Sequence, residues 1–191
     1  KNQIQNTGIY GAQNIGFDLC LKNEWLLFWG SDDYAFNKDS ISNLRKEIST
    51  HKSHDLIIFK GIFVNPNTGI GKSKNHFSLI KTQSFDAHKY KNILFQGFRQ
   101  AHQGTLINPR KNLKGLKYDD KLILAADLNF YLACSKINKL KVRIVNTNIA
   151  KIGQGGISRK KNILRFKEVI YIYFKYFKFL FFVPFILRYI K

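Results

Sequence analysis

Methionine is absent from the 191 residues, and cysteine and proline are scarce. The two cysteines, Cys20 and Cys134, lie far apart and form no CxxC pair, which excludes a disulfide framework and a cysteine zinc site. Two isolated cysteines indicate reduced, packed thiols in a cytosolic compartment. Because residue 1 is Lys and nothing resembles a signal peptide, we expect the chain to be the later part of a longer protein, or a trimmed form of one.

Acidic side chains are also few. The 32 Lys and Arg residues against 12 Asp and Glu residues leave a net charge of +20. Such an excess predicts an anionic partner, and nucleic acid, nucleotide phosphates and acidic lipid all fit that description. The length is sufficient for one domain with a substantial core.

Helical and strand patterns alternate along the chain, which indicates an α/β layer architecture. The predicted helices cover residues 9–21, a short stretch from residue 38, and 122–137. The apolar face of the first helix is defined by the spacing of Ile9, Ala12, Ile15, Gly16 and Leu19. The predicted strands cover residues 25–29, 56–64, 105–108 and 141–145, whereas residues 70–95 are polar and weakly patterned.

The run from Trp25 to Asp33 is the most informative stretch. Its unbroken apolar residues predict a strand covered on both faces, which stops at Gly30, Ser31 and the two carboxylates Asp32 and Asp33. Ligands of open α/β sheets bind outside the carboxyl ends of strands, where paired carboxylates can hold a divalent cation against phosphates. Capping of a helix, or shaping of a loop, is the alternative role of the two carboxylates.

Three separated motifs follow one another in a recognisable order. They are Gly8 to Gly16, then Gly30 to Asp33, then His102-Gln103 followed by Ala125-Ala126-Asp127. With this order and spacing the chain resembles family 2 glycosyltransferases, specifically the bacterial enzymes that build surface polysaccharide, from about residue 6 to residue 158. The resemblance implies an α/β fold of the GT-A type, a Rossmann-like mixed sheet flanked by helices. It also implies transfer of a sugar, with inversion, from a nucleotide-sugar to a glycan or lipid-linked acceptor.

The resemblance assigns the chemistry to three carboxylates. Asp33 would bind Mn²⁺ or Mg²⁺ in a DXD-type motif, and Asp32 would face the nucleotide-sugar. The cation would stabilise the departing diphosphate. Asp127 would be the catalytic base that takes the proton of the acceptor hydroxyl.

Other matched positions would contact the donor and its phosphates. For these positions the residues alone leave three structural alternatives: a structural role for the histidine, a core position for the tyrosine, and an ordinary turn for the glycines. By implied role, these positions are Tyr10 and Asn14 in the donor sugar pocket, His102 and Gln103 near the acceptor or phosphates, and Gly155, Gly156 and Ser158 in a loop over the diphosphate.

The chain also departs from the family's pattern. Gly11 stands where the family has Asp, and Asn6 stands where it has an acidic residue, so the sugar specificity of the donor pocket stays open. The family's opening strand, helix and strand, which grip the nucleobase and ribose, would precede Lys1. We therefore expect a GT-A domain truncated at its N-terminus.

The segment 159–191 has a different composition, with nine basic residues, eleven Phe or Tyr residues and a single acid, Glu168. Its longest uncharged run, 179–187, is about half of the roughly 20 residues that a membrane span requires. We predict a basic amphipathic helix on an anionic membrane surface, bent or ended by Pro184. A helix packed on its own domain or a partner, and a hairpin dipping into the bilayer, are the alternatives. The predicted apolar face comprises Phe166, Val169, Ile170, Tyr173, Phe177, Leu180 and Phe181.

These observations predict a partial GT-A domain over 1–158 and a membrane-associating tail over 159–191. The predicted function is a metal-dependent, hexosyltransferase-type enzyme of surface polysaccharide synthesis, peripheral on the cytoplasmic face of the cell membrane. An inactive remnant with a binding role is one alternative, and a basic nucleic-acid-binding protein is another. Nucleic acid is not the expected partner, because the aromatic residues gather in an apolar tail and do not alternate with Lys and Arg on a sheet.

Overall fold

A computed structural model describes residues 8–65, 68, 71–73, 81–110, 112–153 and 161–190. In this part of the chain, six strands form one mixed sheet: β1 (Tyr34–Ala35), β2 (Leu56–Val64), β3 (Gly71–Ser73), β4 (Gln83–Asp86), β5 (Thr105–Ile107) and β6 (Lys141–Gly153). The long strands β2 and β6 run parallel at its centre. β1 and β4 pair antiparallel with β6, whereas β3 and β5 pair antiparallel with β2.

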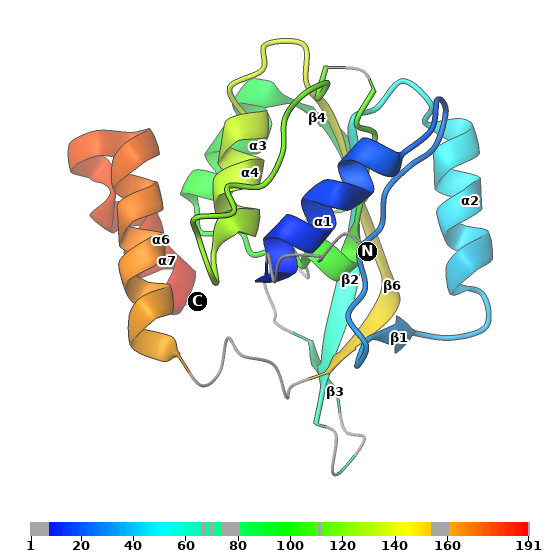
Figure 1. Ribbon diagram of the computed structural model, residues 1–191, viewed down its shortest axis with the longest axis horizontal. Coiled ribbons are helices and arrows are strands. Elements are labelled where there is room, and N and C mark those ends of the chain that lie inside the picture. The colour runs from blue at the N-terminus through cyan, green and yellow to red at the C-terminus, as the bar shows by residue number, and fades with distance from the viewer. Residues whose placement is uncertain are drawn as a thin grey trace, which may run out of the picture.

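Helices cover both faces of the sheet (Figure 1). The helices are α1 (Gly8–Leu19), α2 (Ser40–Thr50), α3 (Ala87–Phe95), α4 (Ala126–Cys134), α6 (Asn162–Phe177) and α7 (Phe182–Ile190), and short 3-10 helices are η2 (His102–Gly104) and η3 (Lys178–Leu180). α2 packs on one face, while α1, α3 and α4 pack on the other. α6 and α7, drawn in orange and red in Figure 1, form a hairpin that packs against α4 and α3.

The strand β2 divides the core into two clusters. Leu56 and Ile58 face the cluster under α1, α3, α4 and α6, whereas Ile57 and Phe59 face the cluster under α2, and all four are fully buried. Successive side chains of a strand point to opposite faces, so a run without polar residues suits a strand covered on both sides. The predicted strand 56–64 is confirmed with these bounds.

Residues 25–29 are extended but form no full strand, which corrects the prediction. Leu26 makes a single antiparallel bridge to Ile107 of β5, with N···O distances of 2.8 and 2.9 Å. The side chains alternate as expected, since Leu26 and Phe28 pack in one cluster and Trp25 and Trp29 in the other. The segment is only half buried, because it lies at the edge of the described sheet beside the short strand β5.

Helix α1 confirms the predicted helix but buries a different face. Tyr10 and Phe17 are buried, and the ring of Phe17 contacts three other aromatic rings on that side of the sheet. Large aromatic side chains bury more apolar area than the aliphatic ones and therefore determine the inward face. The three large residues of the predicted apolar face are exposed: Ile9 at 54%, Ile15 at 45% and Leu19 at 71%.

The region 70–95 shows no clear pattern in the sequence, and its described residues form three short elements: β3, β4 and α3. Asp86 caps the N-terminus of α3, where its side chain accepts a hydrogen bond from the N–H of Lys89 at 2.8 Å. It buries Tyr90 and Leu94. β4 has three exposed residues and one partly buried residue, so its alternation carries too little contrast to be recognised.

The tail folds as two helices, and its bend lies before the predicted position. The chain turns at Lys178, which has a φ of 52°, and continues through η3 into α7. Pro184 lies in the first turn of α7, where a missing backbone N–H leaves no hydrogen bond unmade.

Candidate functional site

Asp33 connects two segments at one edge of the sheet. Its Oδ2 accepts a hydrogen bond from the N–H of Gly30 at 2.7 Å, and its Oδ1 accepts one from the N–H of Gly153 at 3.3 Å. Gly153 is the last residue of β6. The turn after residues 25–29 is therefore held against the carboxyl end of a central strand, as expected for a ligand site of an α/β sheet.

Asp32 lies directly against the backbone of Gly153. A Cβ at position 153 would stand 2.3 Å from Asp32 Oδ2 and 2.6 Å from its Cγ. Only a glycine leaves room for the carboxylate there. Asp32 is exposed and Asp33 is partly buried, so the two carboxylates form a pair open to solvent.

Asp127 lies in the first turn of α4 and is partly exposed. Its Oδ1 accepts the N–H of Leu128 at 2.7 Å. A carboxylate at a helix N-terminus interacts favourably with the helix dipole.

A residue that lies outside the sequence motifs holds the start of α4. Glu168 of α6 is buried, and its carboxylate accepts hydrogen bonds from the N–H groups of Ile123, Leu124 and Ala125 at 2.8, 2.8 and 2.9 Å. The loop that leads to Asp127 is therefore fixed by α6. The available signal in the sequence was the occurrence of one acid among nine basic residues in the tail.

His102 lies in η2, close enough to both Asp127 and Asp33 to interact with their charges. Burial lowers the pKa of His102, while the two carboxylates act in the opposite direction. A hydrogen bond and a close approach of two backbone segments hold η2 in place. The Trp29 Nε1–H donates to the backbone oxygen of Gln103 at 2.8 Å, and a Cβ at Gly104 would stand 2.5 Å from Phe59 O.

Tyr10 and Asn14 project from α1 to different neighbours. Burial raises the pKa of Tyr10, the charge of Asp127 adds to this rise, and hydrogen bonds from the backbone of Asp127 and Ala126 oppose it. Tyr10 therefore lies at the start of α4. The side chain of Asn14 instead forms two hydrogen bonds with the backbone of Tyr118. Its Nδ2 donates to Tyr118 O and its Oδ1 accepts from Tyr118 N, both at 2.9 Å.

The structure thus brings some of the predicted residues together and separates others. Asp33, His102 and Asp127 lie within one electrostatic neighbourhood, with Tyr10 beside Asp127 and Asp32 beside Asp33. Gln103 contributes a backbone contact, and the amide of Asn14 is used by Tyr118. The predicted residues Gly155, Gly156 and Ser158 lie outside the described residues.

The residues fit a cation held jointly with a ligand. Among the described residues, no group of three or more His, Cys, Asp and Glu side chains is placed to enclose a metal ion. Mg²⁺ and Mn²⁺ bound through one or two carboxylates plus substrate phosphates need no such group. Asp33 accepts one N–H at each oxygen and keeps lone pairs free, and Asp32 is exposed beside it.

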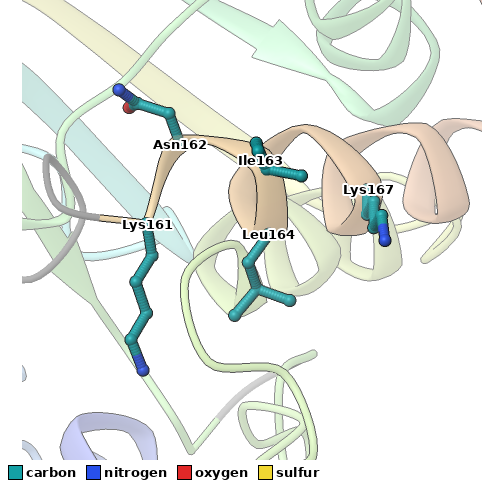
Figure 2. A pocket seen from close by; sticks show the side chains of 5 residues that line it. All are labelled: Lys161, Asn162, Ile163, Leu164 and Lys167. Carbon is teal, nitrogen blue, oxygen red and sulfur yellow. The ribbon is translucent and has the colours of Figure 1, made fainter.

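A shallow pocket of about 500 Å³ lies elsewhere, at the beginning of α6 (Figure 2). None of the residues predicted for the site contributes to its lining. The lining residues are Lys161, Asn162, Ile163, Leu164 and Lys167.

Known glycosyltransferases resemble the chain in sequence. A PGL/p-HBAD biosynthesis glycosyltransferase of Mycobacterium tuberculosis is 27% identical over 154 residues, which cover 79% of this chain and 53% of the relative. An uncharacterized glycosyltransferase of Methanocaldococcus jannaschii is 25% identical over 134 residues, which cover 70% of this chain and 43% of the relative. No protein-family model matches the chain.

Solved structures of S. aureus TarS resemble it in fold. The structure of residues 1–349 in complex with UDP superimposes with a TM-score of 0.61 at 16% sequence identity, over 90% of this chain and 46% of that one. A second structure of S. aureus TarS gives a TM-score of 0.60, also at 16% identity, over 91% of this chain and 28% of that one.

The fold is GT-A-like. This confirms the predicted fold class, a mixed sheet flanked by helices. The chain spans about half the length of the curated relatives that it matches. In the described GT-A-like structure, no helix has both the length and the apolar composition needed to cross a membrane.

Proposed function

We propose that this chain carries the catalytic part of a metal-dependent inverting glycosyltransferase of surface glycan synthesis. The observation that carries the proposal is that the charges of Asp33 and Asp127 both act on His102, although the three residues come from segments about 70 and 25 residues apart in the sequence. The glycosyltransferase relatives and the UDP complex of TarS support a nucleotide-sugar donor.

In the proposed reaction, the acceptor hydroxyl oxygen attacks the anomeric carbon and the bond to the nucleoside diphosphate breaks. The hydroxyl proton passes to a carboxylate oxygen of Asp127, and attack from the face opposite the leaving group inverts the anomeric centre. Asp33 and Asp32 would hold Mn²⁺ or Mg²⁺, which would stabilise the negative charge of the leaving diphosphate. His102, kept neutral near pH 7 by its lowered pKa, is available as a hydrogen-bond partner near both carboxylates.

Replacement of the proposed base tests this mechanism. Asp127→Asn keeps the size of the side chain but removes its ability to accept the proton, so we expect kcat to fall by about 10²- to 10⁴-fold. The affinity for the nucleotide-sugar, measured by calorimetry, should remain within about twofold.

The matched control is Asp120→Asn, which neutralises an exposed carboxylate in the loop before α4. This variant should retain the transfer rate of the parent protein. Unchanged turnover in Asp127→Asn would exclude Asp127 as the base.

The proposal extends to the place of the acceptor, which we expect at a membrane surface that the α6–α7 hairpin contacts. Part of the face predicted to meet lipid packs on the domain instead, since Val169 and Tyr173 are buried with Ile172. The exposed apolar side chains, which include Ile170 and Leu180 of the predicted face, form what we name the outer face of the hairpin. The outer face comprises Ile163, Ile170, Phe174, Phe179, Leu180, Phe182, Ile186 and Ile190.

Basic side chains accompany the outer face. Lys161, Lys167 and Lys178 are all exposed. Figure 2 shows the start of α6, where the lysines Lys161 and Lys167 and apolar side chains line the same shallow pocket. Apolar residues beside lysines suit an interface with anionic lipid, where the apolar groups enter the acyl boundary and the lysines stay among the headgroups.

A further inference from the structure

Three arginines converge where the α6–α7 hairpin meets the rest of the domain. Arg99 follows α3, Arg165 lies on α6, and Arg188 lies on α7. The ion pairs of the described chain are His51 with Glu47, Lys117 with Asp18, and Arg143 with Glu47. None of the three arginines therefore has a carboxylate in direct contact.

Backbone contacts hold Arg99 and Arg188 together. The Nη2 of Arg99 donates to the backbone oxygen of Arg188, and the guanidinium carbon of Arg99 lies 4.8 Å from the ring centroid of Tyr189. The two segments approach so closely that a Cβ at Gly97 would stand 2.6 Å from the backbone nitrogen of Arg188. The position of the two guanidinium groups is therefore set by the docking of α7.

Aromatic contacts place the third arginine in the same cluster, because the guanidinium carbon of Arg165 lies 5.7 Å from the ring centroid of Phe166, which lies 4.8 Å from that of Tyr189. Electrostatic effects agree with this placement. Burial lowers the pKa of Arg99 to about 10, with further contributions from the charges of Arg188 and Arg165. Burial also lowers the pKa of Arg188, but the phenol of Tyr173 and the carboxylate of Asp127 outweigh it, and the result is a raised pKa. The cluster thus extends to the proposed base.

Hydrogen-bond donors remain available in the cluster. The Nε atoms of Arg99 and Arg165 are both buried without a hydrogen-bond partner among the described residues. A buried donor without a partner is unfavourable, and like charges held close together add to this. An anion with several oxygens would remove both penalties at once. Phosphate is the anion whose geometry the guanidinium fork matches best.

We propose that Arg99, Arg165 and Arg188 bind a phosphate group carried by the acceptor. The inference rests on the proposed function, since it places this phosphate beside Asp127, where the acceptor hydroxyl would react. The donor diphosphate would instead lie at Asp32 and Asp33. The site therefore selects a hydroxyl acceptor that carries a phosphate monoester or diester close to the reacting group.

Binding can be measured without any transfer reaction. The probes are glycerol 3-phosphate by calorimetry and vesicles of phosphatidylcholine with phosphatidic acid by cosedimentation. We expect at least one probe to bind, and Arg99→Gln and Arg165→Gln each to weaken that binding about tenfold. The preferred probe shows whether the phosphate is carried on a soluble glycan or on a lipid. Binding of neither probe, or equal binding by the variants, would overturn the proposal.

The matched control is Arg45→Gln, which removes an exposed arginine of α2 on the other face of the sheet. It should bind the probes like the parent protein. Arg99→Lys keeps the charge but loses the fork, and it should recover only part of the affinity. Arg99 and Arg165 are both partly exposed, so their variants test the site even where Arg188→Gln fails to fold.

Kinetics separate this proposal from the proposed function. With a phosphate-bearing acceptor, Arg99→Gln should raise the acceptor KM about tenfold and leave the donor KM unchanged. A raised donor KM would assign the cluster to the donor diphosphate and overturn the proposal. Phosphate binding through the arginines without any sugar transfer would refute the proposed function alone. Transfer with an unchanged acceptor KM in Arg99→Gln would refute the arginine site alone.

Discussion

Gly153 ends β6 at the point where the carboxylate of Asp32 lies against the strand. An alanine there would push that carboxylate away, because its Cβ would stand 2.3 Å from Asp32 Oδ2. The Cβ of Asp32 would also lie only 2.8 Å away, so the backbone of Asp32 must shift as well, and we expect Gly153→Ala to lower the free energy of unfolding by about 1–3 kcal/mol. We expect the Mn²⁺-dependent affinity for a nucleoside diphosphate to fall about tenfold, as measured by calorimetry.

Gly61→Ala is the matched control, because its Cβ would meet the Cδ1 of Ile152 at 2.5 Å in the same pair of strands, with no carboxylate involved. It should alter stability to a similar extent but leave nucleotide binding unchanged. Asp33→Ala should abolish the Mn²⁺ dependence. Full Mn²⁺-dependent binding in both Gly153→Ala and Asp33→Ala would count against the cation site.

His102 makes the stability of the protein dependent on pH. Its pKa is lowered from 6.5 by burial, so the unfolded chain binds a proton at a higher pH than the native protein does. Between these two pKa values the unfolded state holds more protons, and the free energy of unfolding decreases as the pH falls. Urea unfolding at about pH 7.5 and about pH 5.5 should show this loss, and His102→Gln should reduce it.

His88→Gln provides the comparison, since it removes an exposed imidazole from α3. It should leave the difference between the two pH values as in the parent protein. Titration of the imidazole resonances by NMR gives a direct check. A His102 resonance that titrates above pH 6.5 would contradict the lowered pKa.

At the scale of elements, α4 depends on α6 for the support of its N-terminus. The Glu168 carboxylate receives three backbone N–H groups just before α4. Glu168→Gln replaces one acceptor oxygen by an N–H₂ group that faces those donors, and hydrogen bonds to a charged group contribute roughly 1.5–3 kcal/mol. We expect the free energy of unfolding, from urea titration, to fall by about 2 kcal/mol. We also expect kcat to fall more than the donor KM changes, because Asp127 is displaced.

Glu24→Gln is the control for this change. Glu24 also accepts a backbone N–H, that of Leu21 at 2.7 Å, but it is exposed. Its replacement should change the free energy of unfolding by less than about 0.5 kcal/mol. Equal effects of the two replacements would mean that the burial of Glu168 contributes little to holding α4.

The elements themselves were predictable where one strong pattern ran through them. β2 shows an unbroken apolar run, and α4 carries closely spaced apolar residues, so both were located from the sequence. β4 was missed because its four residues are mostly exposed. In α1 the helix was predicted correctly and its buried face was not. The inward side of a helix depends on which neighbours it meets, and here these are aromatic rings.

At the scale of the whole molecule, the α6–α7 hairpin has an inner face on the domain and an outer face that remains apolar. Phe179 is 86% exposed and Phe182 is 48% exposed. Replacing both with Asp removes apolar area and adds repulsion from anionic lipid, so we expect the affinity for vesicles containing phosphatidylglycerol to fall at least about tenfold. Cosedimentation measures this loss, and the free energy of unfolding should change by less than about 1 kcal/mol.

The control also removes exposed apolar area and adds two negative charges, but on α1 and not on the hairpin. Ile9 and Leu19 of α1 are 54% and 71% exposed, and their joint replacement by Asp should leave vesicle binding within about twofold. Equal losses in the two double variants would show that binding follows net charge alone. In that case the outer face of the hairpin would not be the membrane contact.

The sequence by itself determined the fold class and most of the long elements, and it supplied Asp33 and Asp127 as predicted site residues, because apolar periodicity and short motifs are local properties. The tertiary structure decided which segments meet. It placed Gly153 under Asp32, Glu168 under the loop before α4, and the arginines beside Asp127. It also turned Val169 and Tyr173 of the predicted lipid face inward and left Ile170 and Leu180 exposed. These contacts join residues far apart in the chain, and their energies depend on burial and charge in three dimensions, which no local pattern records.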